Sequence, residues 1–144
     1  MTMSIRDVLK NKGNTVFSIS ADATVYKALE LMASENVGAL LVVEGEKVVG
    51  MISERDYARK VILEGRSSLK TVVQKIMVTK VLYITPETSV EEGLALMSDK
   101  RCRHLPVLED KKLVGMVSIG DLVKAQVAEK DFMINQLEHY ILGS

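Results

Sequence analysis

The sequence contains few of the residues on which several protein classes depend. Its single cysteine, Cys102, excludes an internal disulfide and fits a reducing cytoplasm. It has no tryptophan, two phenylalanines and four tyrosines, so stacking platforms for single-stranded nucleic acid are scarce. Neither sign of charge is in excess, because Lys plus Arg and Asp plus Glu each total 19, and this balance argues against a general nucleic-acid binder.

Long hydrophobic runs are also missing. The longest, such as Gly38–Val43, are far too short to cross a bilayer, and the N-terminus lacks the apolar segment of a signal peptide. The 144 residues, of which 47% are hydrophobic and 26% charged, have the size and composition of one soluble globular domain. We therefore expect a cytoplasmic protein that needs neither a disulfide nor a metal to fold.

The chain contains an internal repeat. Residues Val16–Val61 align with Val81–Gln126 at an offset of 65 residues, without a gap, and 15 of the 46 aligned pairs are identical. The register persists through Gly50 and Gly115 and through two Ser-x-x-Asp groups, which chance similarity between apolar segments would not preserve. The sequence is therefore two copies of one unit.

Each copy has the same predicted order of elements, β-α-β-β-α. A β-branched stretch comes first, then a helix with one apolar face, two strands joined by a polar turn, and a second helix. Thr24 and Ser89 are the expected N-caps of the first helices, and Gly45 suits a positive φ in the first turn. The predicted strands are 16–19, 40–43 and 48–52 in one copy and 81–84, 105–108 and 113–117 in the other, and the second helices begin at Ser53 and Ser118 and run through Val61 and Val127.

One such unit is too small for a stable core of its own, so we expect the two copies to pack around a pseudo-two-fold axis with related clefts between them. The predicted fold class is α/β, in the α+β sense. We assign residues 1–70 to the first repeat with its N-terminal segment and linker, 71–128 to the second repeat, and 129–144 to a helical tail. The start at Ile5–Leu9 has an echo in Val72–Met77, ahead of the second repeat. The tail is expected to pack on the module or on a partner, because five apolar residues there have near-helical spacing: Phe132, Met133, Leu137, Tyr140 and Ile141.

The ends of the two units carry a shared motif, Gly-h-h-Ser-x-x-Asp, in which h is apolar. It reads Gly50-Met51-Ile52-Ser53-Glu54-Arg55-Asp56 in the first copy and Gly115-Met116-Val117-Ser118-Ile119-Gly120-Asp121 in the second. Together with the strand entry Arg103-His104-Leu105-Pro106-Val107, these segments resemble a pair of CBS domains, the Bateman module, of the bacterial stand-alone type. The resemblance covers about residues 1–127 and implies a regulatory module with no catalytic domain attached.

The chemistry of the motif favours ligand binding. Glycine at a strand end lets a ligand or a backbone approach closely. Serine at a helix N-terminus stands beside free N–H groups and the positive end of the helix dipole, which favour a phosphate. The aspartate one turn later offers two acceptor oxygens to the hydroxyls of a ribose, and ribose plus phosphate means a nucleotide. The alternative is that Ser53 with Asp56, and Ser118 with Asp121, simply cap their helices.

The resemblance implies that each cleft combines the motif of one repeat with the strand and helix starts of the other. The first cleft would take Ser53, Arg55, Asp56 and Arg59 with Thr85, Thr88, Cys102, Arg103, His104, Leu105 and Pro106. The second would take Ser118 and Asp121 with Ile19, Ala23, Val37, Gly38, Ala39 and Leu40. We predict stronger phosphate binding in the first cleft, because arginines offer paired donors and the second cleft is much less cationic. The adenine would lie in an apolar slot near residues 37–40 or 102–105.

Three residues keep alternative interpretations. Cys102 is either a small buried residue equivalent to Val37 or a thiol activated by the arginines that flank it. His104 is a phosphate donor or a structural residue rather than a catalytic base, because no nucleophile and carboxylate form a set with it. Lys12 either reaches a phosphate or belongs to a simple turn. The spacing of His and Cys offers no metal site.

These observations predict a non-catalytic sensor of an adenine nucleotide such as AMP, ATP or NAD, which acts on an unidentified regulated protein and forms a homodimer. The alternative is an interaction scaffold whose clefts stay empty and whose dimer surface is the function. An enzyme is disfavoured because no nucleophile–base set is present. Nucleic acid and membrane partners are not expected.

Overall fold

The computed structural model describes residues 3–142, and its contacts divide the chain into two compact units. Unit 2 is the continuous stretch Val16–Val81, and unit 1 combines the segment before it with everything after it. The predicted N-terminal segment and tail begin at residue 1 and end at residue 144, so their outermost two residues lie outside the described part.

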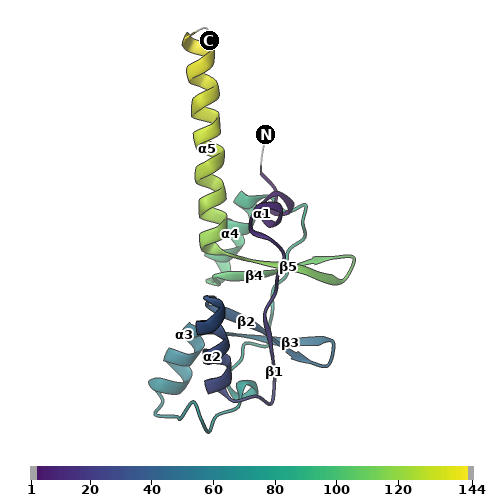
Figure 1. Ribbon diagram of the computed structural model, residues 1–144, viewed down its shortest axis with the longest axis vertical. Coiled ribbons are helices and arrows are strands. Elements are labelled where there is room, and N and C mark those ends of the chain that lie inside the picture. Colours follow the sequence, from purple (N-terminus) through teal and green to yellow (C-terminus); the bar gives the residue numbers. More distant parts are fainter. Residues whose placement is uncertain (1–2, 143–144) are drawn as a thin grey trace. The chain divides into compact units, whose positions relative to one another are not determined.

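Unit 2 contains a three-stranded sheet of order β1-β2-β3, in which β1 runs parallel to β2 and β2 antiparallel to β3 (Figure 1). Helix α2 places Val25, Ala28 and Met32 in a core shared with Leu40 and Val42 of β2. The elements are β1 (Ser18–Ser20), α2 (Val25–Glu35), β2 (Ala39–Glu44), β3 (Lys47–Ser53), α3 (Glu54–Tyr57), the π-helical turn η1 (Ala58–Ile62) and the 3₁₀ turn η2 (Val73–Lys75).

Unit 1 repeats this arrangement around the antiparallel pair β4–β5. The counterpart of β1 is reduced to a single parallel bridge between Ile84 and Val107. The core is formed by α1, α4, the strands and the start of α5, and it includes Val90, Leu105 and Leu122. The elements are α1 (Ile5–Lys12), α4 (Val90–Lys100), β4 (His104–Glu109), β5 (Lys112–Ser118) and α5 (Ile119–Leu142).

The local predictions are largely confirmed. Thr24 caps α2 and Ser89 caps α4, each through a side-chain oxygen that accepts a backbone N–H three residues on. Gly45 has φ 62° in the β2–β3 turn, as predicted. The β4–β5 turn differs, because Asp110 and Lys111 both have positive φ, at 51° and 65°, which is the pattern of a type I′ turn. The two repeats therefore close their hairpins with different backbone geometry.

The segments that precede the two repeats are exchanged. Helix α1, ahead of the first repeat, buries Ile5 and Val8 in the core of the second, whereas η2, ahead of the second repeat, places Val73 in the core of the first. The hydrogen bonds match pair by pair: Ile5 N donates to Thr88 O at 2.8 Å, and Val73 N donates to Ala23 O at 2.8 Å. Packing therefore groups the N-terminal segment with the second repeat, whereas the prediction placed it with the first.

The last helix is longer than predicted. The second helix of repeat 2 was expected to end near Val127 and to be followed by a separate tail helix, but α5 continues without a break from Ile119 to Leu142. Its beginning packs against α4 and α1, and it then runs on past both helices (Figure 1). Residues 131–141 are all exposed.

Candidate functional site

Both copies of the Gly-h-h-Ser-x-x-Asp motif lie where a strand ends and a helix begins. Ser53 is the last residue of β3 and the N-cap of α3, and Ser118 is the last residue of β5, directly before α5. The strand holds the serine in extended backbone, and the first helical turn brings the aspartate back over it. The repeat therefore produces the same carboxylate–serine arrangement twice.

In unit 2 this arrangement is a capping box. The Ser53 N–H donates to Asp56 Oδ2 at 2.9 Å, and the Asp56 N–H donates to Ser53 Oγ at 3.2 Å. Lys60, one turn further along, places its ammonium 3.3 Å from Asp56 Oδ1 and donates to Ile76 O at 3.0 Å. Asp56 is therefore fixed by its own helix start and paired with a cation at i+4.

Unit 1 has the same box with a different cation. The Ser118 N–H donates to Asp121 Oδ2 at 2.8 Å, and Asp121 N donates to Ser118 Oγ at 3.1 Å. The ammonium of Lys12, at the end of α1, donates to the same Oδ2 at 2.8 Å and to Met116 O at 2.8 Å. Burial raises the pKa of Asp121, but the hydrogen bonds from Lys12 and Ser118 outweigh it and leave that pKa below its usual value.

The amides of the first helical turn are mostly occupied in both units. Glu54 N donates to Gly38 O at 3.1 Å, and Ile119 N donates to Arg103 O at 2.8 Å. Because the aspartate N–H is taken by serine Oγ, the turn keeps only the amides of Arg55 and Gly120 without an acceptor among the described residues. Positive charge for an anion must therefore come chiefly from side chains rather than from these backbone groups.

The motif glycines leave room for other parts of the same chain to approach closely. A Cβ on Gly50 would lie 2.7 Å from Val78 O and 2.8 Å from Met77 Sδ, and a Cβ on Gly115 would lie 2.8 Å from Leu9 Cδ2. The segments that approach so closely are the exchanged ones that precede each repeat. Of the two predicted reasons for these glycines, close approach of the polypeptide is the one observed.

Comparison with known proteins identifies the family. The CBS domain matches residues 5–63 and 73–128, which together cover most of the chain. The chain belongs to the CBS domain family. It is 46% identical, over 97% of its length and 72% of the relative's, to the mitochondrial CBS domain-containing protein CBSX3 of Arabidopsis thaliana.

Solved CBS structures agree with this assignment. A CBS-domain protein of Burkholderia ambifaria MC40-6, proposed to act in signal transduction, is 48% identical, with a TM-score of 0.86 over 88% of this chain and 95% of that one. The CBS domain pair of protein MJ0100, in complex with 5′-methylthioadenosine and S-adenosyl-L-methionine, shares the fold at 21% identity, with a TM-score of 0.78 over 90% of this chain and 99% of that one. The predicted tandem-CBS, α+β fold is confirmed.

The structure places the predicted site residues in two sets, one in each unit. Each motif lies beside the strand entry of its own repeat, and Lys12 joins the motif of the second. The residues of each predicted cleft are therefore divided between the two units, and their combination across repeats stays a prediction. Unit 2 holds Ser53, Arg55, Asp56, Arg59, Ile19, Ala23, Val37, Gly38, Ala39 and Leu40, and unit 1 holds Thr85, Thr88, Cys102, Arg103, His104, Leu105, Pro106, Ser118, Asp121 and Lys12.

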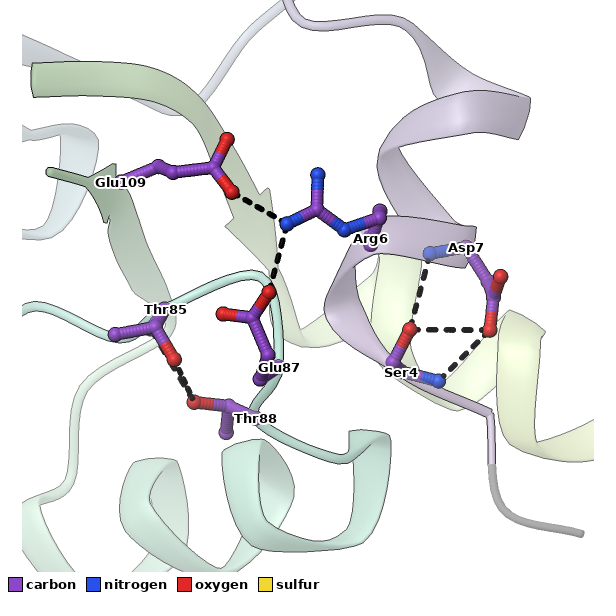
Figure 2. A network of polar contacts seen from close by, with 7 residues as sticks. All are labelled: Ser4, Arg6, Asp7, Thr85, Glu87, Thr88 and Glu109. Atoms are coloured by element: carbon purple, nitrogen blue, oxygen red, sulfur yellow. Dashed lines mark hydrogen bonds and ion pairs between the residues drawn. The ribbon is translucent and has the colours of Figure 1, made fainter.

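Thr85 and Thr88, which were both predicted to contact the ligand, form hydrogen bonds with each other in the segment before α4. Thr85 N donates to Thr88 Oγ1 at 3.2 Å, and the two hydroxyl oxygens are 3.3 Å apart (Figure 2). Nearby, Arg6 of α1 lies between Glu87 and Glu109 and pairs with both, which raises the arginine pKa. These contacts fasten α1 to the second CBS repeat.

Two further predicted residues have shifted pKa values. Burial lowers the pKa of His104, and the nearby charges of Lys12 and Arg103 lower it further against the opposing effect of Asp121. The lowered pKa disfavours the imidazolium form, so His104 is less suited to supply positive charge to a phosphate than to donate a hydrogen bond. Burial raises the pKa of Cys102, which is the opposite of activation and agrees with a small, partly buried residue.

Among residues 3–142, no three His, Cys, Asp or Glu side chains gather where they could hold a metal ion. Within the same residues, no helix combines the length and apolar character needed to cross a bilayer. Lys60, which pairs with Asp56, was not among the predicted site residues, although its i+4 spacing from Asp56 was a readable signal.

Proposed function

We propose that this CBS pair is a regulatory module that binds an adenine nucleotide of the AMP, ATP or NAD type at Asp56 and Asp121. The observation that carries the proposal is the duplicated carboxylate. In each repeat one oxygen, Oδ2, accepts the N–H of the motif serine. The other oxygen, Oδ1, keeps acceptor capacity for a ribose hydroxyl, although in Asp56 it also lies 3.3 Å from the Lys60 ammonium. Asp121 Oδ1 has no hydrogen-bond donor among the described residues.

A cation beside each carboxylate supports the phosphate part of the proposal. The ammonium groups of Lys60 and Lys12 lie 3.3 Å and 2.8 Å from the two aspartates. Arg55 lies within the first motif and Arg59 follows it, both exposed, and Arg103 precedes β4. The chain is neutral as a whole, so this local basic character is a feature of the motif regions rather than of the surface in general.

The fold is compatible with adenosine-containing ligands, since the similarly folded pair of MJ0100 holds two of them. Binding without turnover agrees with a family of regulatory modules, and a bound nucleotide would shift the population of conformations seen by a regulated protein. The homodimer expected from the sequence remains part of this proposal, as do a cytoplasmic location and the absence of nucleic-acid and membrane partners.

Calorimetric titration of the purified chain with AMP, ATP, NAD and S-adenosylmethionine tests the proposal. We expect one of these ligands to bind, Asp56→Ala to weaken binding more than Asp121→Ala, and Asp99→Ala, an exposed carboxylate on α4, to change nothing. Equal losses from the two motif variants would contradict the stronger first site. Absence of heat for every ligand at millimolar concentration, with no nucleotide found by mass spectrometry after purification, would refute nucleotide sensing and favour the scaffold.

A further inference from the structure

The second half of α5 presents an apolar surface outside the CBS repeats. The family match ends at residue 128, and the contacts of α5 with the core of unit 1 lie near its start, where Leu122 is buried and Ala125 packs beside it. Beyond that point, residues 131–141 are exposed, although they include six large apolar side chains. Such a surface on a single long helix is unusual for a chain that works alone.

The apolar residues are not scattered. Val127, Ile134, Leu137 and Ile141 stand at i, i+7, i+10 and i+14, which places them along one side of the helix, and Val123 continues the line toward unit 1. We call these five residues the tail stripe. Ile134, Leu137 and Ile141 are 53%, 59% and 78% exposed. The spacing is that of a two-helix seam.

The charges around the tail stripe indicate what covers it. Lys130 is the one charged residue in line with the stripe, and Lys124 and Glu138 flank the same side of it, 14 residues apart. A parallel copy would set Lys130 against Lys130 and would leave Lys124 and Glu138 without opposite charges. An antiparallel copy shifted by seven residues in one direction would set Asp131 beside Glu138 twice and would form no opposite-charge pair at the flanks. Shifted in the other direction, it would set Lys124 beside Asp131 but would place Ile141 beyond the start of α5, without an apolar partner on that helix.

We propose that two copies of this chain pair their tail stripes in antiparallel orientation. In the register that the charges favour, Val123 faces Ile141 of the second copy, Val127 faces Leu137, and Lys130 lays its methylene stem along Ile134. Each Lys124 then lies next to a Glu138 of the second copy, so two opposite-charge pairs flank the seam. Asp131 meets its own counterpart at the two-fold axis on the exposed rim, where like charges are screened.

Sedimentation of the full chain without nucleotide tests the pairing, independently of ligand binding. We expect a dimer of twice the 15.9 kDa chain mass. Leu137→Glu should raise the dissociation constant by about tenfold or more, because it puts a charge in the seam. Gln136→Glu adds the same charge one residue away, off the stripe, and should leave association unchanged. Both positions are exposed and outside the core, so circular dichroism should show two folded proteins.

Cysteine cross-linking tests the orientation. In a Cys102→Ala background, Asp131→Cys should form a covalent dimer under mild oxidation, because the two copies of residue 131 meet at the axis only in the antiparallel register. Ile134→Cys should cross-link less, since each copy then faces residue 130. A monomeric wild-type chain, a Leu137→Glu protein that associates like the wild type, or preferential cross-linking through Ile134→Cys would overturn the proposal and leave the stripe to a different occupant.

Discussion

Alanine substitution of Gly50 and Gly115 tests two kinds of close contact, one with backbone and one with a side chain. At Gly115 the new methyl group would meet the side chain of Leu9, at 2.8 Å from Cδ2 and 3.0 Å from Cδ1. At Gly50 it would meet backbone, at 2.7 Å from Val78 O, as well as Met77 Sδ at 2.8 Å. Neither glycine has positive φ, so the substitution adds volume without backbone strain.

The structure sets the expected magnitudes. Overpacking lowers the free energy of unfolding by about 1–3 kcal/mol. Replacing glycine by alanine at a compatible φ raises it by about 0.4–1 kcal/mol, because the unfolded chain loses conformational entropy. The end of Leu9 can rotate away, so we expect Gly115→Ala to destabilise by about 1 kcal/mol. The Val78 carbonyl is held by Met51 N at 2.9 Å, while Val78 N donates to Met51 O at 2.8 Å, so it cannot yield without loss of both bonds. We expect Gly50→Ala to cost about 2–3 kcal/mol.

Urea unfolding of single and double variants measures these terms. Leu9→Ala should abolish the cost of Gly115→Ala, because it removes both clashing methyl groups. Met77→Ala should leave most of the cost of Gly50→Ala, because the carbonyl remains. If Gly115→Ala were as harmful in the Leu9→Ala background as in the wild type, the close approach of α1 would not explain the motif glycine.

Two further changes test the Lys12 pair and the second hairpin. Lys12→Met should raise the pKa of Asp121, measurable by NMR titration, with Lys10→Met as the control. The stability contributed by the pair is present above the ordinary aspartate pKa and is lost as the pH falls through the lowered folded value, so the unfolding curves should differ by at most about 1 kcal/mol near neutral pH and converge in acid. Lys111→Gly should stabilise by about 1 kcal/mol, since Lys111 has φ 65°. An unchanged or lower urea midpoint for that variant would contradict the assigned turn.

Features set by neighbours in the chain could be predicted from the sequence. The caps at Thr24 and Ser89 depend on atoms three residues apart, and the hairpins on adjoining strands, so a single pass along the chain finds them. The continuity of α5 was also readable, because no glycine or proline lies between Asp121 and Leu142 to end the helix. The expectation of a break near Val127 gave too much weight to the boundary of the repeat.

Features that depend on distant segments could not be read in this way. The echo between Ile5–Leu9 and Val72–Met77 shows that the two segments are equivalent, but not that each packs on the other repeat. The bond from Lys12 to Asp121 joins residues 109 apart in sequence, so the spacing of the motif could not indicate it. The serine and aspartate of each motif were predictable as a group, whereas the cation that pairs with Asp121 follows from tertiary packing alone.

The exchanged segments also set the order in which the residues of the two cores become available during translation. Unit 2 is continuous in sequence, so all the residues of its core are present once Val81 has been synthesised. Ile5 and Val8 of α1 precede unit 2 in the chain, yet the other buried members of their core, from Ile84 to Leu122, follow it. The core of unit 1 can therefore be completed only after the whole of unit 2 has been synthesised. For the same reason, deleting residues 1–15 would remove Ile5 and Val8 from the core of the second repeat, although the first repeat is nearer to them in the sequence.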